Sequence, residues 1–318
     1  MSDLTVRVRR KRAEALDIAS FELVRPEGGP LPGFSAGSHV DVHVPGGPMR
    51  PYSLCNDDGD PSHYRIAVLR DAGSRGGSTA MHDGVAEGDL LVIGAPRNQF
   101  PLQHAARTLL FAGGIGITPL LCMAQRLAAS GADFRLHYCT RSAERTAFRD
   151  ELAASPFAER VRFHHDDGDA GQRFDARAAL ADPHPDQRIY VCGPRGFIDH
   201  VTAAARASGL PADRIHIEHF AAEPVDASGD RAFGVRIASS GLVCDVPAGT
   251  SVVQALAAHG VEIPVSCEQG ICGTCVTRVL AGECDHRDMY FSEDEQARND
   301  QFTPCCSRAK SPLLVLDL

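Results

Sequence analysis

The chain has 318 residues, of which 43% are hydrophobic and 23% charged, a composition typical of a folded protein with two or three domains. Its formal net charge of −9 argues against nucleic-acid binding. The first residues lack the apolar run of a signal peptide, and no apolar stretch could span a bilayer. We therefore expect a cytoplasmic protein that does not bind membranes, in which the eleven cysteines are mostly reduced thiols.

Residues 1–103 carry short β-branched or alternating runs separated by Gly/Pro clusters, which predicts an antiparallel barrel or sandwich. The expected strands are Thr5–Val8, His39–Val44, Tyr64–Leu69 and Leu90–Ile93. The basic run from Arg7 to Arg12 is expected on a solvated strand and turn.

Residues 104–221 alternate apolar strands with helical stretches, the pattern of a parallel sheet with helices on both faces. The expected strands are Thr108–Ala112, Phe134–Cys139, Val161–His165 and Ile189–Cys192, and the expected helices are Pro119–Ala129, Thr146–Ala154 and Gly196–Ser208.

Residues 222–231 are small, polar and interrupted by proline, which predicts a linker. Residues 232–318 then form a small α+β module, with expected strands Phe233–Ala238 and Leu242–Val246 and a helix over Val252–His259. Residues 227–318 hold seven Lys and Arg side chains against twelve Asp and Glu. This acidic end of the chain suits docking on a basic partner.

Four cysteines in the last module have the spacing C-x4-C-x2-C followed by a distant Cys, which is typical of a plant-type [2Fe–2S] site. The ligands that the spacing selects are Cys267, Cys272, Cys275 and Cys305. A structural zinc site is the alternative, but such sites usually show two C-x2-C pairs. Cys306 directly follows the last ligand and is its one serious rival.

A glycine turn follows the first strand of the α/β segment, over Gly113, Gly114 and Gly116. Such a turn lets the backbone approach a pyrophosphate at a helix N-terminus, with Thr118 as N-cap and Pro119 at the first helical position. A merely tight strand–helix connection is the alternative. The nucleotide interpretation gains support from Cys192-Gly193-Pro194, at the end of a later strand of the same sheet.

Two further stretches of the first segment could bind a phosphate and a flat ring. Arg50-Pro51-Tyr52-Ser53 precedes an expected strand, and the glycine-rich stretch from Gly73 to Ser78 leads into a short helix. An arginine fork and a Gly-Gly-Ser turn can hold one anion, and Tyr52 offers an aromatic face. Taken singly, each is better explained as a solvated arginine or a core tyrosine.

With these motifs in this order, the chain resembles the phthalate dioxygenase reductase and vanillate demethylase reductase family over essentially its whole length. The resemblance implies an FMN-binding antiparallel β-barrel (1–103), an NADH-binding α/β domain with a parallel sheet (104–221), and a ferredoxin-like (β-grasp) [2Fe–2S] domain (232–318). It assigns Arg50, Tyr52, Ser53, Arg75, Gly76, Gly77 and Ser78 to the flavin, and Gly113, Gly114, Gly116, Thr118, Pro119, Cys192, Gly193 and Pro194 to the nucleotide. It also implies that Phe220, which could instead be ordinary core, stacks on the flavin.

The choice of NADH over NADPH is also implied by the resemblance. Asp166, Asp167 and Asp169 follow an expected strand and would repel a 2′-phosphate, whereas Arg141 could bind one. The neighbouring His164 and His165 have no spaced partners and are expected to be strand or loop residues rather than metal ligands.

The implied function is that of an NADH-dependent reductase that passes electrons through FMN and the cluster to a separate Rieske-type aromatic oxygenase or O-demethylase. No acid or base residue is expected in the hydride step, and one chain can complete every site as a monomer. A cytochrome P450 as the acceptor, or a non-catalytic redox sensor, are the alternatives.

Overall fold

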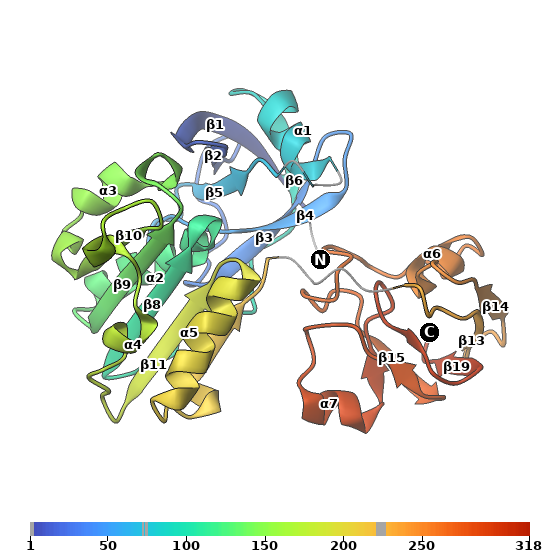
Figure 1. Cartoon of the computed structure of the whole chain (residues 1–318). Coiled ribbons are helices and arrows are strands. Elements are labelled where there is room, and N and C mark those ends of the chain that lie inside the picture. Colours follow the sequence, from blue (N-terminus) through green and yellow to red (C-terminus); the bar gives the residue numbers. More distant parts are fainter. Residues whose placement is uncertain (1–2, 72, 74–75, 221–226) are drawn as a thin grey trace. The chain divides into compact units, whose positions relative to one another are not determined.

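The computed structural model describes residues 3–71, 73, 76–220 and 227–318. The chain divides into two compact units, residues 1–220 and 221–318 (Figure 1). No helix in the described part is long and apolar enough to cross a membrane.

The first unit begins with a seven-stranded antiparallel sheet, which confirms the predicted barrel. Its strands are β1 (Leu4–Ala15), β2 (Ile18–Val24), β3 (Ser38–His43), β4 (Met49–Ser53), β5 (Tyr64–Leu69), β6 (Leu90–Ile93) and β7 (Arg97–Asn98). They follow the order β4-β3-β6-β1-β2-β5, with β7 paired to β3. Alternate side chains such as Val6 and Val8 fill the core, while Arg7 and Arg9, each next to one of them in sequence, face solvent, as expected of the basic run.

The stretch from Arg50 to Ser53 was expected before a strand, but it lies within β4. Pro51 obscures this strand in the sequence, because proline is disfavoured inside sheets. β4 pairs only with β3 in the ladder order, so it is an edge strand where a missing N–H is tolerated.

The second sheet of this unit has five parallel strands in the order β10-β9-β8-β11-β12. They are β8 (Arg107–Gly113), β9 (Asp133–Thr140), β10 (Val161–His165), β11 (Gln187–Cys192) and β12 (Ile215–Glu218). The helices are α2 (Ile117–Ala129), α3 (Arg149–Ala153), α4 (Ala176–Ala179) and α5 (Arg195–Ala207). Separate apolar cores, one around α2 and one around α5, cover the two faces of the sheet, as predicted.

The start of α2 differs from the prediction. A 3-10 turn over Gly114–Gly116 runs directly into the helix, so Gly116 rather than Thr118 is the N-cap. The Thr118 hydroxyl instead donates to the carbonyl of Ile115 at 3.1 Å. Pro119 is consequently the third helical residue, still in the first turn, where its missing N–H would have no partner within the helix.

The second unit is a five-stranded sheet in the order β14-β13-β19-β15-β17, with α6 (Val252–Ala257) packed on it. Its strands are β13 (Phe233–Ile237), β14 (Val243–Val246), β15 (Thr277–Ala281), β17 (Gln301–Phe302) and β19 (Leu313–Leu316). β16 (Cys284–Asp285) and β18 (Arg308–Ala309) form a separate pair, and α7 (Glu293–Arg298) precedes β17. The parallel pairing of β13 with β19 joins the two ends of the module, as a β-grasp fold requires.

A buried ion-pair network closes this module. Asp230 pairs with both Arg287 and Arg308. Arg308, only 4% exposed, also donates to the backbone carbonyls of Arg231 and Pro247. Asp285 also pairs with Arg287, so two carboxylates face two guanidiniums, and this network ties the beginning of the module to its end.

Candidate cofactor and electron-transfer sites

The predicted nucleotide loops meet at the centre of the parallel sheet. β8 and β11 are neighbours, with β9 and β10 on one side and β12 on the other, so their carboxyl ends form the switch point of the sheet. A Cβ on Gly116 would overlap the carbonyl of Cys192, and one on Gly193 would lie 2.8 Å from the Cα of Gly113. The two loops therefore touch backbone to backbone, and only glycine allows this contact.

The glycines of these loops are required for two different structural reasons. Gly113, Gly116 and Gly193 permit the contact between the loops, which the sequence did not indicate. Gly114 has open space around it and a φ of 54°, so its backbone conformation is what favours glycine. Pro194 packs against Gly113, where a Cβ would come within 2.9 Å of the proline ring.

The loops that follow β9 and β10 lie side by side at the same edge of the sheet. The backbone N–H of Asp166 donates to Thr140 at 3.1 Å, and that of Asp167 donates to Arg141 at 3.2 Å. All three of these side chains, Arg141, Asp166 and Asp167, are exposed. The arginine that could bind a 2′-phosphate and the aspartates that would repel one are therefore neighbours.

The neighbouring histidines are structural, as expected. His164 lies in β10 and stacks on His137 of β9, with ring centroids 5.3 Å apart and Nε2 of His164 3.1 Å from Nδ1 of His137. Burial lowers the pKa of His137 to about 4. His165 contacts the Thr140 hydroxyl at 3.0 Å.

The two stretches predicted to bind a phosphate lie together, one in β4 and the other at the start of α1 (Gly77–Gly84). A Cβ on Gly77 would lie 3.2 Å from Cγ of Arg50, so the arginine side chain passes over the first turn of this helix. Gly76 is the N-cap, with a φ of 94°. A guanidinium beside helical N–H groups is an anion-binding arrangement, which fits a cofactor phosphate.

The predicted flavin set also includes Ser78, Arg75 and Tyr52. Ser78 accepts a hydrogen bond from the backbone N–H of Asp71 at 3.1 Å. Arg75 lies outside the described residues. Tyr52 is half-buried beside Arg50, and burial raises its pKa to about 12. Its phenol is therefore neutral, and its ring remains available as an apolar face.

Three polar side chains join the barrel to the nucleotide sheet. Ser53 ends β4 and hydrogen-bonds with the carboxyl of Glu218, the last residue of β12. The fully buried Cys192 thiol donates to Oε2 of Glu218 at 4.0 Å. Burial raises the pKa of Glu218 to about 8, and the Ser53 hydrogen bond only partly offsets this.

This contact brings together residues from the two predicted cofactor regions. Ser53, predicted for the flavin, and Cys192, predicted for the nucleotide, both contact the carboxyl of Glu218. Sequence reasoning gave Glu218 no role, because a short half-buried strand such as β12 carries little periodic signal. Phe220 follows β12 with 40% of its surface exposed, so it is not a core residue.

The cysteine loop has the features that an iron–sulfur cluster needs. Cys267, Cys272 and Cys275 are buried, and Cys305 is half-buried. The Cys267 thiol contacts those of Cys272 and Cys305, and the Cys275 thiol also contacts Cys305, so the four sulfur atoms form one connected group. Hydrogen bonds between the thiols lower the pKa of Cys267 and Cys275 and raise the pKa of Cys272 and Cys305, because one sulfur accepts and the other donates in each contact.

Polar groups of the loop form hydrogen bonds with the sulfur atoms. The N–H of Gln269 donates to Sγ of Cys267 at 3.3 Å, and the Thr274 hydroxyl lies 3.1 Å from Sγ of Cys272. Gly270 and Gly273 have positive φ, and a Cβ on either would overlap a neighbour, Cys306 or Tyr290 respectively. Four connected sulfur atoms with a backbone N–H and a hydroxyl beside them fit a two-iron cluster.

A mononuclear site fits less well. Among the described residues, no three His, Cys, Asp or Glu side chains gather closely enough to hold one metal ion, as a four-cysteine zinc site would require. Cys306 packs against Gly270, with its Sγ 3.3 Å from the Thr303 hydroxyl. Cys284 is a buried core residue, whose pKa burial raises to about 11.

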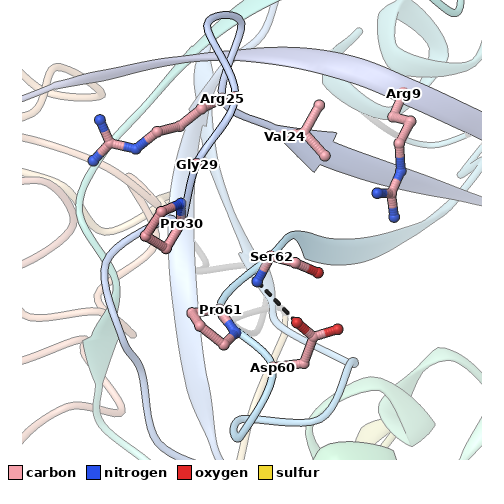
Figure 2. Close-up of a pocket in the computed structure, with 9 residues that line it drawn as sticks. Arg9, Val24, Arg25, Gly29, Pro30, Asp60, Pro61 and Ser62 are labelled. Carbon is pink, nitrogen blue, oxygen red and sulfur yellow. Dashed lines mark hydrogen bonds between the residues drawn. The ribbon is translucent and has the colours of Figure 1, made fainter.

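A cavity of about 520 Å³ lies elsewhere on the barrel, and Figure 2 shows its lining. Arg9 and Arg25 flank it, and Asp60 accepts a hydrogen bond from the N–H of Ser62 at 2.9 Å. Arg9 is already paired with Glu22 at 3.1 Å. None of the predicted site residues lines this cavity, so we assign no role to it.

A nucleotide-binding sheet, an anion site on a barrel and a cysteine loop for a cluster together define an electron-transfer oxidoreductase. Two protein-family profiles agree: residues 110–203 match the oxidoreductase NAD-binding domain, and residues 235–310 match the 2Fe-2S iron-sulfur cluster binding domain.

Comparison with known proteins identifies the family. The chain is 55% identical over 308 residues to the vanillate O-demethylase oxidoreductase of Pseudomonas sp. (strain HR199 / DSM 7063), covering 96% of this chain and 97% of that one. The structure of a phthalate dioxygenase reductase matches with a TM-score of 0.79 and 43% identity, covering 100% of this chain and 98% of that one. An intact self-sufficient cytochrome P450 monooxygenase matches with a TM-score of 0.85 and 40% identity, covering 99% of this chain but 41% of that one.

The chain belongs to the phthalate dioxygenase reductase and vanillate demethylase reductase family. The predicted fold class and the predicted cofactors, FMN, NADH and a [2Fe–2S] cluster, are thereby confirmed. The protein is an enzyme, and it serves as the reductase component of an oxygenase system.

Proposed function

We propose that this reductase supplies electrons from NADH to a separate O-demethylase oxygenase that acts on a methoxylated aromatic acid such as vanillate. The 55% identity to a vanillate O-demethylase oxidoreductase along 96% of the chain carries this choice of acceptor. The meeting of Ser53, Cys192 and Glu218 supports the electron route, because it joins the flavin and nucleotide regions at one point.

The chain holds and orients its cofactors, whose chemistry is their own. When bound, FMN converts the hydride of NADH into single electrons that a [2Fe–2S] cluster can accept. In our proposal Arg50 and the Gly76–Ser78 turn hold the FMN phosphate, with Arg75 assigned by family resemblance alone, while Tyr52 and Phe220 flank its ring.

The nucleotide lies on the switch-point loops in this proposal. The residues assigned to it are Gly113, Gly114, Gly116, Thr118, Pro119, Cys192, Gly193 and Pro194. Glu218, whose pKa of about 8 keeps it protonated at neutral pH, maintains its hydrogen bond with Ser53 without placing a negative charge beside the reacting rings. Cys267, Cys272, Cys275 and Cys305 hold the cluster.

We infer that the exposed carboxylates of Asp166 and Asp167 favour NADH by repelling a 2′-phosphate, despite the neighbouring Arg141. Replacing both by asparagine should narrow the ratio of kcat/KM for NADH over NADPH, whereas Arg141→Ala should widen it. The opposite pattern would place the ribose elsewhere.

We further infer that the protein works as a cytoplasmic monomer. Eleven unpaired thiols favour a reducing compartment, and each cofactor region is assembled from residues of one chain. Light scattering of the cofactor-loaded protein would reveal a dimer if this inference is wrong.

The test is reconstitution. The purified protein is first titrated anaerobically with NADH and followed by optical and EPR spectra, with flavin bleaching and then a reduced [2Fe–2S] signal expected. It is then mixed with a vanillate O-demethylase oxygenase, and demethylated product is measured per NADH consumed. Internal reduction without product would reject this acceptor.

The match to the reductase part of a self-sufficient P450 supports a cytochrome P450 as the second candidate acceptor. The same assay, run with a P450 that lacks its own reductase, decides between the two acceptors.

A further inference from the structure

An exposed tyrosine lies directly on the cluster loop. The ring of Tyr290 packs so closely on Gly273 that a Cβ there would overlap it, and 42% of the tyrosine surface faces solvent. Gly273 stands between two predicted cluster ligands, Cys272 and Cys275. The inner edge of Tyr290 packs on Phe291, with centroids 4.9 Å apart, so the ring is held in place. This contact places an exposed aromatic ring directly beside the loop that carries three of the four predicted cluster ligands.

The segment that follows Tyr290 is acidic. Ser292 and Glu295 form a capping box that starts α7, so the first turn of this helix is well defined. Glu293 and Asp294 are exposed in this turn, and in the described part of the chain neither forms an ion pair. Elsewhere in the unit the acids are more often neutralised: Asp230 pairs with Arg287, and Asp317 with Arg278.

We propose that Tyr290, Gly273, Glu293 and Asp294 form the docking face on which the terminal oxygenase receives electrons. This inference rests on the proposed function, because it supposes a separate protein acceptor. At each encounter one electron leaves the reduced cluster and reduces the metal centre of the acceptor, with no bond made or broken. Because Tyr290 lies against the cysteine loop, a partner docked on it would come close to the predicted cluster ligands.

The negative charge of the docking face predicts a partner whose own docking surface is basic. An apolar centre with an acidic rim fits a protein surface on which Lys or Arg residues surround an apolar patch. Nucleic acid and anionic lipid would be repelled by Glu293 and Asp294. Because rim charges act mainly on the association rate, the interaction should weaken as salt rises.

The molecule offers a matched control. α7 lies next to β17 at one edge of the sheet, whereas β14 is the opposite edge strand (Figure 1). β14 also carries an exposed apolar residue, Val243 at 55%, next to an exposed acid, Asp245. The double variant Val243→Ala/Asp245→Asn therefore removes similar groups far along the sheet from the docking face.

The test uses the cofactor-loaded full chain with two electron acceptors. Cytochrome c serves as a basic protein probe, and ferricyanide as a small probe that can accept electrons without docking. We expect Glu293→Gln/Asp294→Asn to lower kcat/KM for cytochrome c by about three- to tenfold at low salt and to flatten its salt dependence. Tyr290→Ala should lower it at all salt concentrations, and Tyr290→Phe should not.

Ferricyanide reduction, the EPR signal of the reduced cluster and the melting temperature check that each variant keeps its cofactors and fold. An equal loss in the β14 control, or no loss in the α7 and Tyr290 variants, would overturn the proposal. The same variants are then assayed with the O-demethylase oxygenase. If the wild type fails with that oxygenase while the cytochrome c pattern holds, the proposed function is wrong and the docking face stands.

Discussion

At the scale of single residues, Glu218 links burial to pH dependence. Its pKa is about 8 in the folded protein against an ordinary value of 4.5. Between these values the folded state keeps a proton that the unfolded state has lost, so the free energy of unfolding falls as pH rises and levels off above about 8.

Glu218→Gln removes this titration while keeping the shape of the side chain. We expect the melting temperature of the variant, relative to the wild type, to rise from pH 5 to pH 8.5. Scanning calorimetry of both proteins over this range measures the difference. Glu262→Gln, at an exposed position, serves as the control. A difference that does not change with pH would mean that Glu218 titrates normally.

The adjacent cysteines provide a second residue-level prediction. Cys305 contacts the thiols of Cys267 and Cys275, whereas Cys306 packs on Gly270 near the Thr303 hydroxyl. Cys305→Ser should therefore lose the [2Fe–2S] EPR signal and most of the bound iron, and Cys306→Ser should keep both. The reverse result would identify Cys306 as the fourth ligand.

At the scale of elements, the contact between the two nucleotide loops is what positions β8 against β11. Gly116→Ala would push its Cβ into the carbonyl of Cys192 and separate the loops. We expect kcat/KM for NADH to fall by about a hundredfold, since small displacements at a reacting site are costly.

Gly196→Ala is the matched control for that change. Gly196 lies in the first turn of α5, has open space around it and has no positive φ, so alanine there should leave kcat/KM for NADH unchanged. Similar losses in both variants would point to a general effect of alanine on folding rather than to the loop contact.

At the scale of the whole molecule, the two units divide the electron route. Residues 1–220 contain the flavin and nucleotide regions, and residues 221–318 contain the cluster. A chain ending at residue 226 should therefore keep NADH-dependent ferricyanide reduction within about twofold, since a flavin reduced by hydride can pass its two electrons singly to two ferricyanide ions without a cluster. It should lose most of its activity toward cytochrome c, and a truncated protein that kept it would show that the cluster is bypassed.

The sequence was sufficient wherever a signal is local. The cysteine spacing, the glycine turn after an apolar strand and the alternation of Val6 and Val8 each reflect the geometry of a few neighbouring residues. The order of these motifs along the chain was enough to identify the family. The position of Arg50 in β4, the start of α2 at Ile117 and the short strand β12 were missed or misplaced, because pairing and packing overrode weak local preferences.

Contacts between distant segments were decided by tertiary structure alone. Ser53, Cys192 and Glu218 are far apart in sequence and have no common spacing, so only the packing of β4 on the ends of β11 and β12 brings them together. The raised pKa of Glu218 follows from that burial and from nothing in its neighbours along the chain. The contact of Tyr290 with Gly273 was likewise decided by tertiary structure, because a close approach of two segments depends on how the module folds.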